Sequence, residues 1–210
     1  MNTAPQLITV EGIEGAGKST AIDTIAGWLI GQGHRVVTTR EPGGTALGEE
    51  LRSMLLTHRA EGMAPDTEVL LMFAARAEHV ARVIQPALAA GQWVVCDRFV
   101  DASIAYQGGG RGLGADRVEA LAQWALADFT PTLTLWLDVP VEEGLRRAAG
   151  RSTPDRFESE KTRFFEAVRS SYAQLAKAQG DRIVRIDAGV PLEEVTQPIT
   201  TTLEARIARR

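Results

Sequence analysis

The 210-residue sequence has a single cysteine, few aromatic residues and no long apolar run. One cysteine, Cys96, excludes a disulfide framework. No apolar run approaches the length of a membrane-spanning helix, and the first residues do not resemble a signal peptide. We therefore expect a cytoplasmic protein that has no membrane partner.

An excess of positive charge and a metal-binding spacing of histidines are also missing. The formal net charge of −4 argues against a nucleic-acid partner and suggests that the arginines serve a small anionic ligand. We expect surface or helix positions for the three histidines, His34, His58 and His79. Cys96 lies in an apolar run, where burial raises a thiol pKa, so we expect a strand residue and not a nucleophile. With 44% hydrophobic residues, the chain suits one domain over residues 1–210.

Short apolar runs alternate with long segments of helical periodicity along the whole chain. The predicted strands are 7–10, 35–39, 93–97, 133–138 and 182–187. The predicted helices are 19–32, 46–57, 66–89, 115–127, 141–149, 156–178 and 192–208. This alternation predicts an α/β fold with a doubly wound, five-stranded parallel sheet and helices on both faces. Ligands of such folds bind beyond the carboxyl ends of the strands.

A glycine-rich frame, GIEGAGKS at residues 12–19, directly follows the first apolar run. Its glycines let backbone N–H groups converge on a phosphate, and the helix that follows adds its positive dipole. The frame therefore predicts a nucleoside triphosphate site, with Lys18 at the β and γ phosphates and Ser19 on Mg²⁺. The predicted ATP-binding residues are Gly12, Ile13, Glu14, Gly15, Ala16, Gly17, Lys18, Ser19 and Thr20.

Two more polar segments follow predicted strands. The segment REPGGT at 40–45 combines a cation with conformationally special residues, where an acceptor phosphate could sit. Asp97 and Arg98 end the third strand. We expect Asp97 near Mg²⁺, like a Walker-B acid, and Arg98 between the donor and acceptor phosphates. A guanidinium there would clamp the acceptor phosphate and offset the charge that builds during transfer.

With these segments, further motifs make the chain resemble the bacterial thymidylate kinases, which phosphorylate dTMP with ATP. The motifs are LMFAAR at 71–76, DRF at 97–99, AYQGGGRG at 105–112 and DR at 155–156. They cover essentially the whole chain. The resemblance implies the P-loop kinase fold, ATP with Mg²⁺, transfer of the γ-phosphoryl group to dTMP for dTTP synthesis, and a homodimer. It also implies a cis peptide bond between Glu41 and Pro42.

The resemblance assigns roles to individual side chains. Glu14 contacts the acceptor sugar and positions Arg98, while Phe73 stacks on the pyrimidine and Arg76 donates to a ring carbonyl. Spacing alone, however, favours a core position for Phe73. The other acceptor residues that it implies are Arg40, Pro42, Ser103 near the thymine, Tyr106 near the deoxyribose and Gln107 at the base edge.

The segment 146–156 is rich in arginine and contains Gly150 and Pro154, which predicts a mobile lid between two helices. One branch of the family has an arginine at the position of Gly15, so a lid must supply that charge here. The resemblance makes Arg151 the arginine finger and places Arg147 near ATP. The alternative is that both are solvated helix-face residues.

Two other functions stay open. A deoxynucleoside kinase would need a carboxylate base, for which Glu41 or Asp97 would serve, but cations such as Arg98 suit a phosphate acceptor better than a sugar hydroxyl. A nucleotide-gated interaction module would bind ATP without any acceptor. For the expected dimer, the apolar faces at 51–56, 69–73 and 80–84 are candidates, although these residues would also suit a core.

Overall fold

The computed structural model describes residues 6–149, 156–158 and 160–207. Its centre is a five-stranded sheet in the order β2-β3-β1-β4-β5, in which every neighbouring pair is parallel. The strands are β1 (Leu7–Glu11), β2 (Val36–Arg40), β3 (Trp93–Asp97), β4 (Leu133–Asp138) and β5 (Ile183–Asp187). The predicted parallel sheet is confirmed, and each strand begins and ends within one residue of its expected bounds.

The strand register brings polar strand ends together. Asp97 of β3 lies opposite Arg40 of β2 and opposite Val10 of β1, the residue before Glu11. The central strands β1 and β4 are buried along their whole length, as apolar parallel strands covered on both faces must be. Side chains that follow β1, β2 and β3 therefore meet at one edge of the sheet.

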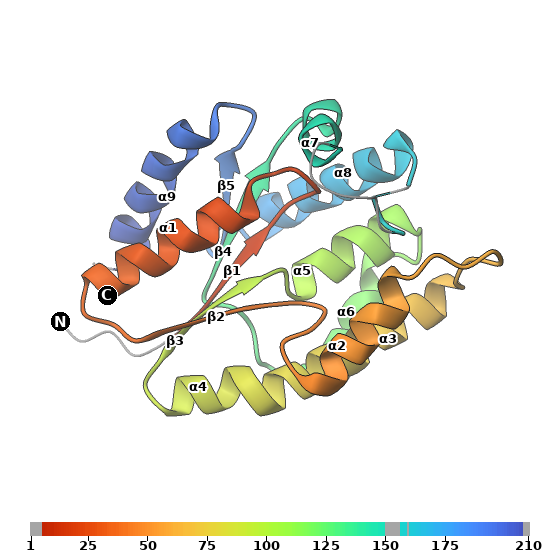
Figure 1. Ribbon diagram of the computed structural model, residues 1–210, viewed down its shortest axis with the longest axis horizontal. Coiled ribbons are helices and arrows are strands. Elements are labelled where there is room, and N and C mark those ends of the chain that lie inside the picture. Colours follow the sequence, from red (N-terminus) through yellow and green to blue (C-terminus); the bar gives the residue numbers. More distant parts are fainter. Residues whose placement is uncertain (1–5, 150–155, 159, 208–210) are drawn as a thin grey trace.

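Helices cover both faces of the sheet (Figure 1). On one face α1 (Lys18–Gly31) packs beside α9 (Leu192–Arg206). The other face carries the remaining helices, which are α2 (Ala46–Leu56), α3 (Pro65–His79), α4 (Gln85–Ala89), α5 (Val100–Ser103), α6 (Ala115–Leu126) and α8 (Thr162–Ala178), while α7 (Val141–Ala148) follows β4 at the carboxyl edge. Among the described helices, none has both the length and the apolarity that crossing a bilayer requires.

Two predicted helices differ from the structure. The helix expected at 66–89 contains a π-helical segment, η1 (Val80–Ile84), between α3 and α4. Pro86 follows this segment, and because proline lacks an N–H the regular hydrogen-bond ladder cannot run through it. The helix expected at 156–178 begins only at Thr162. The turn before it includes Phe157, which is buried in the core and is therefore held by tertiary packing.

The sequence analysis missed α5 and the π-helix η2 (Ile104–Gly110) that continues it. Three successive glycines at 108–110 have low helix propensity, so the local sequence does not favour a helix there. In the structure, η2 packs closely against α8, and a Cβ on Gly109 would lie 2.8 Å from the Cβ of Ser171. A Cβ on Gly110 would lie 2.5 Å from the Phe164 ring. These glycines therefore permit a close helix contact, which no local pattern reveals.

Candidate active site

The glycine-rich frame forms a loop between β1 and the first turn of α1. Gly15 has φ +72°, and a Cβ there would collide with the backbone of Gly144 in α7, so only glycine fits. Lys18 opens α1, and its Nζ donates to the carbonyls of Gly12 at 3.4 Å and Ile13 at 3.3 Å. The Lys18 side chain thus spans the loop in which a phosphate chain would lie.

A polar hollow lies beside this loop. It is lined by Glu14, Gly15, Gly17, Lys18, Ser19, Arg40, Glu41, Arg52, Asp97, Arg98, Ala148 and Glu158. Burial, followed by the charge of Arg98, lowers the pKa of Lys18, although Asp97 and Glu14 act in the other direction. The lining therefore combines four cations, Lys18, Arg40, Arg52 and Arg98, with four carboxylates, Glu14, Glu41, Asp97 and Glu158.

Oxygen ligands suited to a hard cation face the same hollow. Ser19 is exposed at the first turn of α1, and the buried Oδ1 of Asp97 has no hydrogen-bond partner among the described residues. Hydroxyl and carboxylate oxygens are the ligands that Mg²⁺ prefers. The pair Ser19 and Asp97 thus fits a magnesium ion.

Glu14, Arg98 and Tyr106 form a compact group at the end of the loop. The Arg98 guanidinium donates to Glu14 Oε1 at 2.7 Å, and the Tyr106 hydroxyl donates to Glu14 Oε2 at 2.8 Å. Burial raises the pKa of Glu14, but the charges of Arg98 and Lys18 and the bond from Tyr106 outweigh it, so the pKa is lowered overall. Arg98 also lies over the Tyr106 ring, 4.6 Å from its centre. This geometry confirms the expected contact between Glu14 and Arg98.

A second cavity, which we call the acceptor cavity, opens on the other side of this group. Its lining residues are Glu14, Glu41, Pro42, Arg52, Leu56, Met72, Arg76, Arg98, Ala102, Ser103, Tyr106, Gln107 and Phe157. It shares Glu14, Glu41, Arg52 and Arg98 with the polar hollow. A group held in one space can therefore meet a group held in the other at Glu14 and Arg98.

Comparison with known proteins agrees with this geometry. The sequence model of the thymidylate kinase family matches residues 10–199. The chain belongs to the thymidylate kinase family. Among similar proteins, the thymidylate kinase of Alkalilimnicola ehrlichii is 57% identical over 208 residues, covering 99% of this chain and 96% of that protein. Those of Pseudomonas putida strain W619 and Vesicomyosocius okutanii are 54% and 52% identical, over 96% and 95% of this chain and 98% of each relative.

Most of the acceptor residues that the thymidylate kinase resemblance implies line the acceptor cavity. Arg76 is only 2% exposed and donates through Nε to Glu41 Oε2 at 2.6 Å, through a terminal nitrogen to Ser103 Oγ at 3.0 Å, and through the other to the Phe99 carbonyl at 2.9 Å. Pro42 follows a cis peptide bond from Glu41, as expected. Pro42, Arg76 and Ser103 are therefore placed together.

Gln107 is one of the residues that line the acceptor cavity, and its amide has a defined orientation. Its Nε2 donates to the buried carboxylate of Glu68 at 2.8 Å. Because a carboxylate without a proton only accepts, the amide oxygen must be the atom on the other side. That Oε1 is buried and has no partner within the described part of the chain. Gln107, one of the residues that line the cavity, therefore has an unsatisfied acceptor.

The structure does not place Phe73 in the acceptor cavity. Phe73 is 3% exposed and belongs to the hydrophobic core, with the Arg76 guanidinium 4.6 Å from its ring centre. Its neighbour Met72 lines the cavity instead. Met72 and Phe73 both lie one helical turn before Arg76, so the expected role of Phe73 against the base stays a prediction.

Several cavity residues have no predicted role. Arg52 of α2 donates to the Pro42 carbonyl at 2.9 Å and lines both spaces, whereas Arg40 is half exposed, pairs with Glu49 and lines only the polar hollow. Phe157 adds an aromatic wall to the acceptor cavity. No motif marked Arg52 or Phe157. The sequence could have pointed to Arg52 only through its charge and its place in the helix that follows the REPGGT segment.

The predicted lid is only partly described. Arg147, in the last turn of α7, pairs with Glu143 at 2.6 Å and donates to the carbonyls of Ala188 at 2.9 Å and Val190 at 3.1 Å. These bonds turn it toward the segment between β5 and α9, and it does not line the polar hollow. Arg151 lies outside the described residues. Thr20 is exposed in the first turn of α1, next to Ser19.

Proposed function

We propose that this enzyme of the thymidylate kinase family transfers the γ-phosphoryl group of ATP to the phosphate of dTMP, giving dTDP and ADP. The observation that carries the proposal is the junction of two spaces at Glu14 and Arg98. The polar hollow beside the glycine-rich loop would take the triphosphate, and the acceptor cavity would take the nucleoside monophosphate. The attacking phosphate oxygen would then approach the γ phosphate beside the Arg98 guanidinium.

On the donor side, the loop residues from Gly12 to Thr20 would hold ATP. Ser19 and Asp97 would hold Mg²⁺, which supplies charge neutralisation between the β and γ phosphates when it is bound. Lys18 would lie along the phosphate chain. Arg151 is proposed as the arginine finger, and Arg147 as a residue that shapes the donor side from the β5–α9 segment.

On the acceptor side, no general base is required. The second pKa of a phosphate monoester is about 6, so the attacking oxygen is already largely deprotonated at neutral pH. Catalysis then consists of in-line positioning together with charge neutralisation by Lys18, Arg98 and a lid arginine. The Glu14 carboxylate would hold Arg98 in place and would meet the acceptor sugar, near Tyr106.

The base would lie against Met72 and Arg76 with its edge toward Ser103 and Gln107. The free acceptor of Gln107 suits a pyrimidine that carries an N3–H donor, such as thymine or uracil. Cytosine presents an acceptor at N3 and would leave two acceptors facing each other, and an unpaired buried polar group costs about 1–3 kcal/mol. We therefore expect dTMP and dUMP to be preferred over dCMP.

A homodimer is part of the proposal. Of the apolar segments considered for it, Leu55, Val69, Phe73, Val80 and Ile84 are buried in the core. Met54 and Leu70 are exposed by 48% and 58%. Leu70 lines a hollow together with Val69 of α3, Leu113 before α6, and Val118 and Leu121 of α6, and Asp66 and Arg117 complete its lining. This face would form the contact, and light scattering at micromolar concentration tests it. A cytoplasmic location stays a prediction.

The reaction is tested by ADP release in the presence of ATP and Mg²⁺, with dTMP, dUMP, dCMP, AMP and thymidine compared as acceptors. Release stimulated by dTMP, and far less by dCMP and AMP, is the expected result. Release with thymidine alone would replace the proposal with a nucleoside kinase. If no acceptor stimulates release, the proposed kinase activity is wrong and the function is reduced to nucleotide binding.

A further inference from the structure

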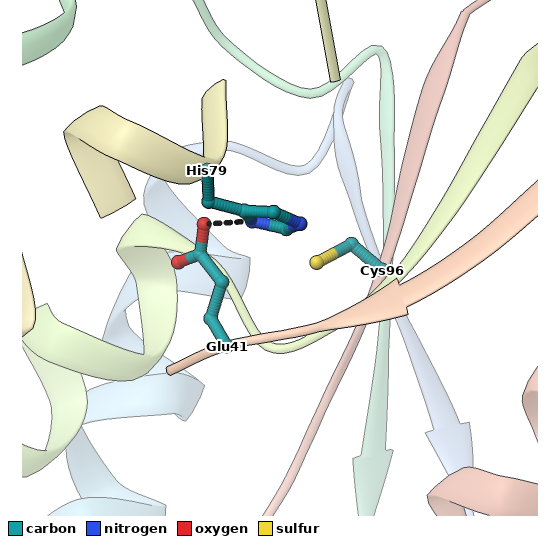
Figure 2. A group of neighbouring side chains, drawn as sticks. All are labelled: Glu41, His79 and Cys96. Carbon is teal, nitrogen blue, oxygen red and sulfur yellow. Dashed lines mark hydrogen bonds and ion pairs between the residues drawn. The ribbon is translucent and has the colours of Figure 1, made fainter. Parts of the chain in front are cut away.

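A buried cluster of Glu41, His79 and Cys96 lies beneath the loop that carries Pro42 (Figure 2). His79 is the last residue of α3, and its ring lies between the Glu41 carboxylate at the end of β2 and the Cys96 sulfur of β3. The exposed fractions of His79 and Cys96 are 0%, and that of Glu41 is 4%. None of the expected roles of the acceptor residues accounts for a histidine at this place.

Both ring nitrogens of His79 have partners. Nδ1 lies 2.9 Å from Glu41 Oε1, and Nε2 lies 2.7 Å from Thr39 Oγ1. An ionised carboxylate only accepts hydrogen bonds, so Nδ1 is the donor to Glu41. The Thr39 hydroxyl fixes the opposite side of the ring. The imidazole is therefore held in one orientation, with its N–H aimed at Glu41.

The other oxygen of the same carboxylate holds Arg76. Glu41 Oε2 accepts from Arg76 Nε at 2.6 Å, and a terminal nitrogen of Arg76 then donates to Ser103 Oγ at 3.0 Å. Arg76 and Ser103 both line the acceptor cavity. A continuous chain of hydrogen bonds thus runs from Thr39 through His79, Glu41 and Arg76 into that cavity.

His79 also supports the loop sterically. A Cβ on Gly44 would lie 2.6 Å from the His79 ring, so the ring underlies the loop on the far side of Pro42 as well. Cys96 makes its own hydrogen bond away from this loop, since its thiol donates to the carbonyl of Arg98 at 3.1 Å. Contacts at Thr39, Glu41 and Gly44 fix the loop before, at and after the turn that presents Pro42 to the cavity.

The three side chains are of types that bind metals, but their hydrogen bonds argue against a metal site. Both oxygens of Glu41 and both nitrogens of His79 already have protein partners. An added cation would have to displace the Arg76 guanidinium from a buried carboxylate or break the bond between His79 and Glu41. The atoms of the cluster are instead arranged to orient one another.

We propose that His79 is a positioning residue of the acceptor cavity: it holds Glu41, and through Glu41 it orients Arg76 toward the nucleoside monophosphate. This inference rests on the proposed function. Since Arg76 faces the base and not the reacting phosphates, loss of the relay should weaken acceptor binding. The turnover number and the KM for ATP should change little.

Two conservative variants separate the two ends of the ring. His79→Asn puts an amide near the position of Nδ1 and keeps a donor for Glu41, whereas His79→Gln puts its amide near Nε2, beside Thr39. We expect His79→Gln to raise the KM for dTMP about tenfold, because a misplaced charged hydrogen-bond donor typically costs about that factor in binding. His79→Asn should restore a KM within about threefold of the original.

The measurement is steady-state kinetics of both variants with dTMP and ATP varied in turn, beside thermal unfolding of each protein. A KM for dTMP that is unchanged in His79→Gln, or raised equally in both variants together with the KM for ATP, would overturn the inference. If the unmodified protein does not phosphorylate dTMP at all, the proposed function fails instead, so the two failures are distinguishable.

A second pair of variants covers the case in which changes at His79 prevent folding. Thr39→Val removes the hydroxyl that orients the ring at nearly constant volume, and Thr39→Ser retains it. A severalfold rise in the KM for dTMP in Thr39→Val, absent in Thr39→Ser, supports the relay. Equal KM values in these two variants contradict it.

Discussion

The Arg98 guanidinium donates to the Glu14 carboxylate at 2.7 Å, although the two residues are 84 positions apart in the sequence. Arg98 follows β3 and has a left-handed backbone with φ +68°, while Glu14 lies in the loop after β1. The pairing of β1 with β3 brings the two residues together. Removal of either partner would leave the other as a partly buried charge without its counterion.

Replacement of Arg98 tests its proposed role in phosphoryl transfer. Arg98→Ala should lower kcat about 1,000-fold or more, because a guanidinium on the transferring phosphate contributes effects of that size. Arg98→Lys retains the charge but loses the planar fork, and we expect a loss of about 100-fold. Both proteins should remain folded by circular dichroism. Near-normal turnover of Arg98→Ala with dTMP would contradict the role.

The sheet could be predicted from the sequence because each strand is a short apolar run that ends at a polar residue. The central strands are covered on both faces, so their composition alone marks them. The helix irregularities could not be predicted in the same way. The π-helix before Pro86 and the helix through Gly108–Gly110 depend on how each segment packs against its neighbours, as the contacts of Gly110 with α8 illustrate.

The candidate site likewise contains residues that the sequence could predict and residues that it could not. Residues in motifs, such as Lys18 and Arg98, lie at the carboxyl edge of the sheet as the sequence predicts. The family resemblance assigns the base-facing role to Phe73, whereas spacing alone favours a core position for it. Both Met72 and Phe73 are apolar, and their neighbours in sequence do not reveal which one lines the cavity. His79 has no motif at all, and its partners Thr39 and Glu41 lie 40 and 38 residues away.

Met72 and Phe73 form a matched pair that tests which of the two side chains meets the base. Met72→Ala should raise the KM for dTMP about tenfold, since loss of apolar contact in a pocket costs about 1–3 kcal/mol, with little change in stability. Phe73→Ala should instead lower the free energy of unfolding by about 3–5 kcal/mol, as truncation of a buried aromatic residue does. Urea unfolding and steady-state kinetics of both variants distinguish them. If Phe73→Ala instead raised the KM for dTMP with little loss of stability, and Met72→Ala did not, Phe73 would be the residue that meets the base.

The contact between η2 and α8 is tested by two glycine substitutions. Gly110→Ala should lower the free energy of unfolding by about 1–3 kcal/mol, because the new methyl group would overlap the Phe164 ring. A methyl group on Gly27, within α1, would meet no atom within 4 Å, so Gly27→Ala should raise the free energy of unfolding by about 0.5–1 kcal/mol. Equal effects of the two changes in urea unfolding would show that close packing does not select glycine at position 110.

Glu11, which ends β1, gives a prediction about pH and stability. It is fully buried, and its carboxyl group accepts from the Phe99 N–H and the Tyr172 hydroxyl, each at 2.7 Å. Burial, followed by the charge of Asp101, raises the pKa of Glu11 from 4.5 to about 8 despite these bonds. Near neutral pH the folded protein therefore holds a proton on Glu11 that the unfolded chain releases.

The contribution of Glu11 to the free energy of unfolding should then fall as pH rises from about 4.5 to about 8 and level off above that range, because the folded state binds the extra proton throughout this interval. Glu11→Gln removes the titration while its amide can still accept from Phe99 N–H and meet Tyr172. Urea unfolding of both proteins at pH 5.5, 7.0 and 8.5 should show the stability of the variant increasing relative to the original protein with each step. Other titrating groups are common to both proteins and largely cancel in the difference. A difference that stays constant across the three pH values would mean that Glu11 is already ionised in the folded protein, and that its two hydrogen bonds offset its burial.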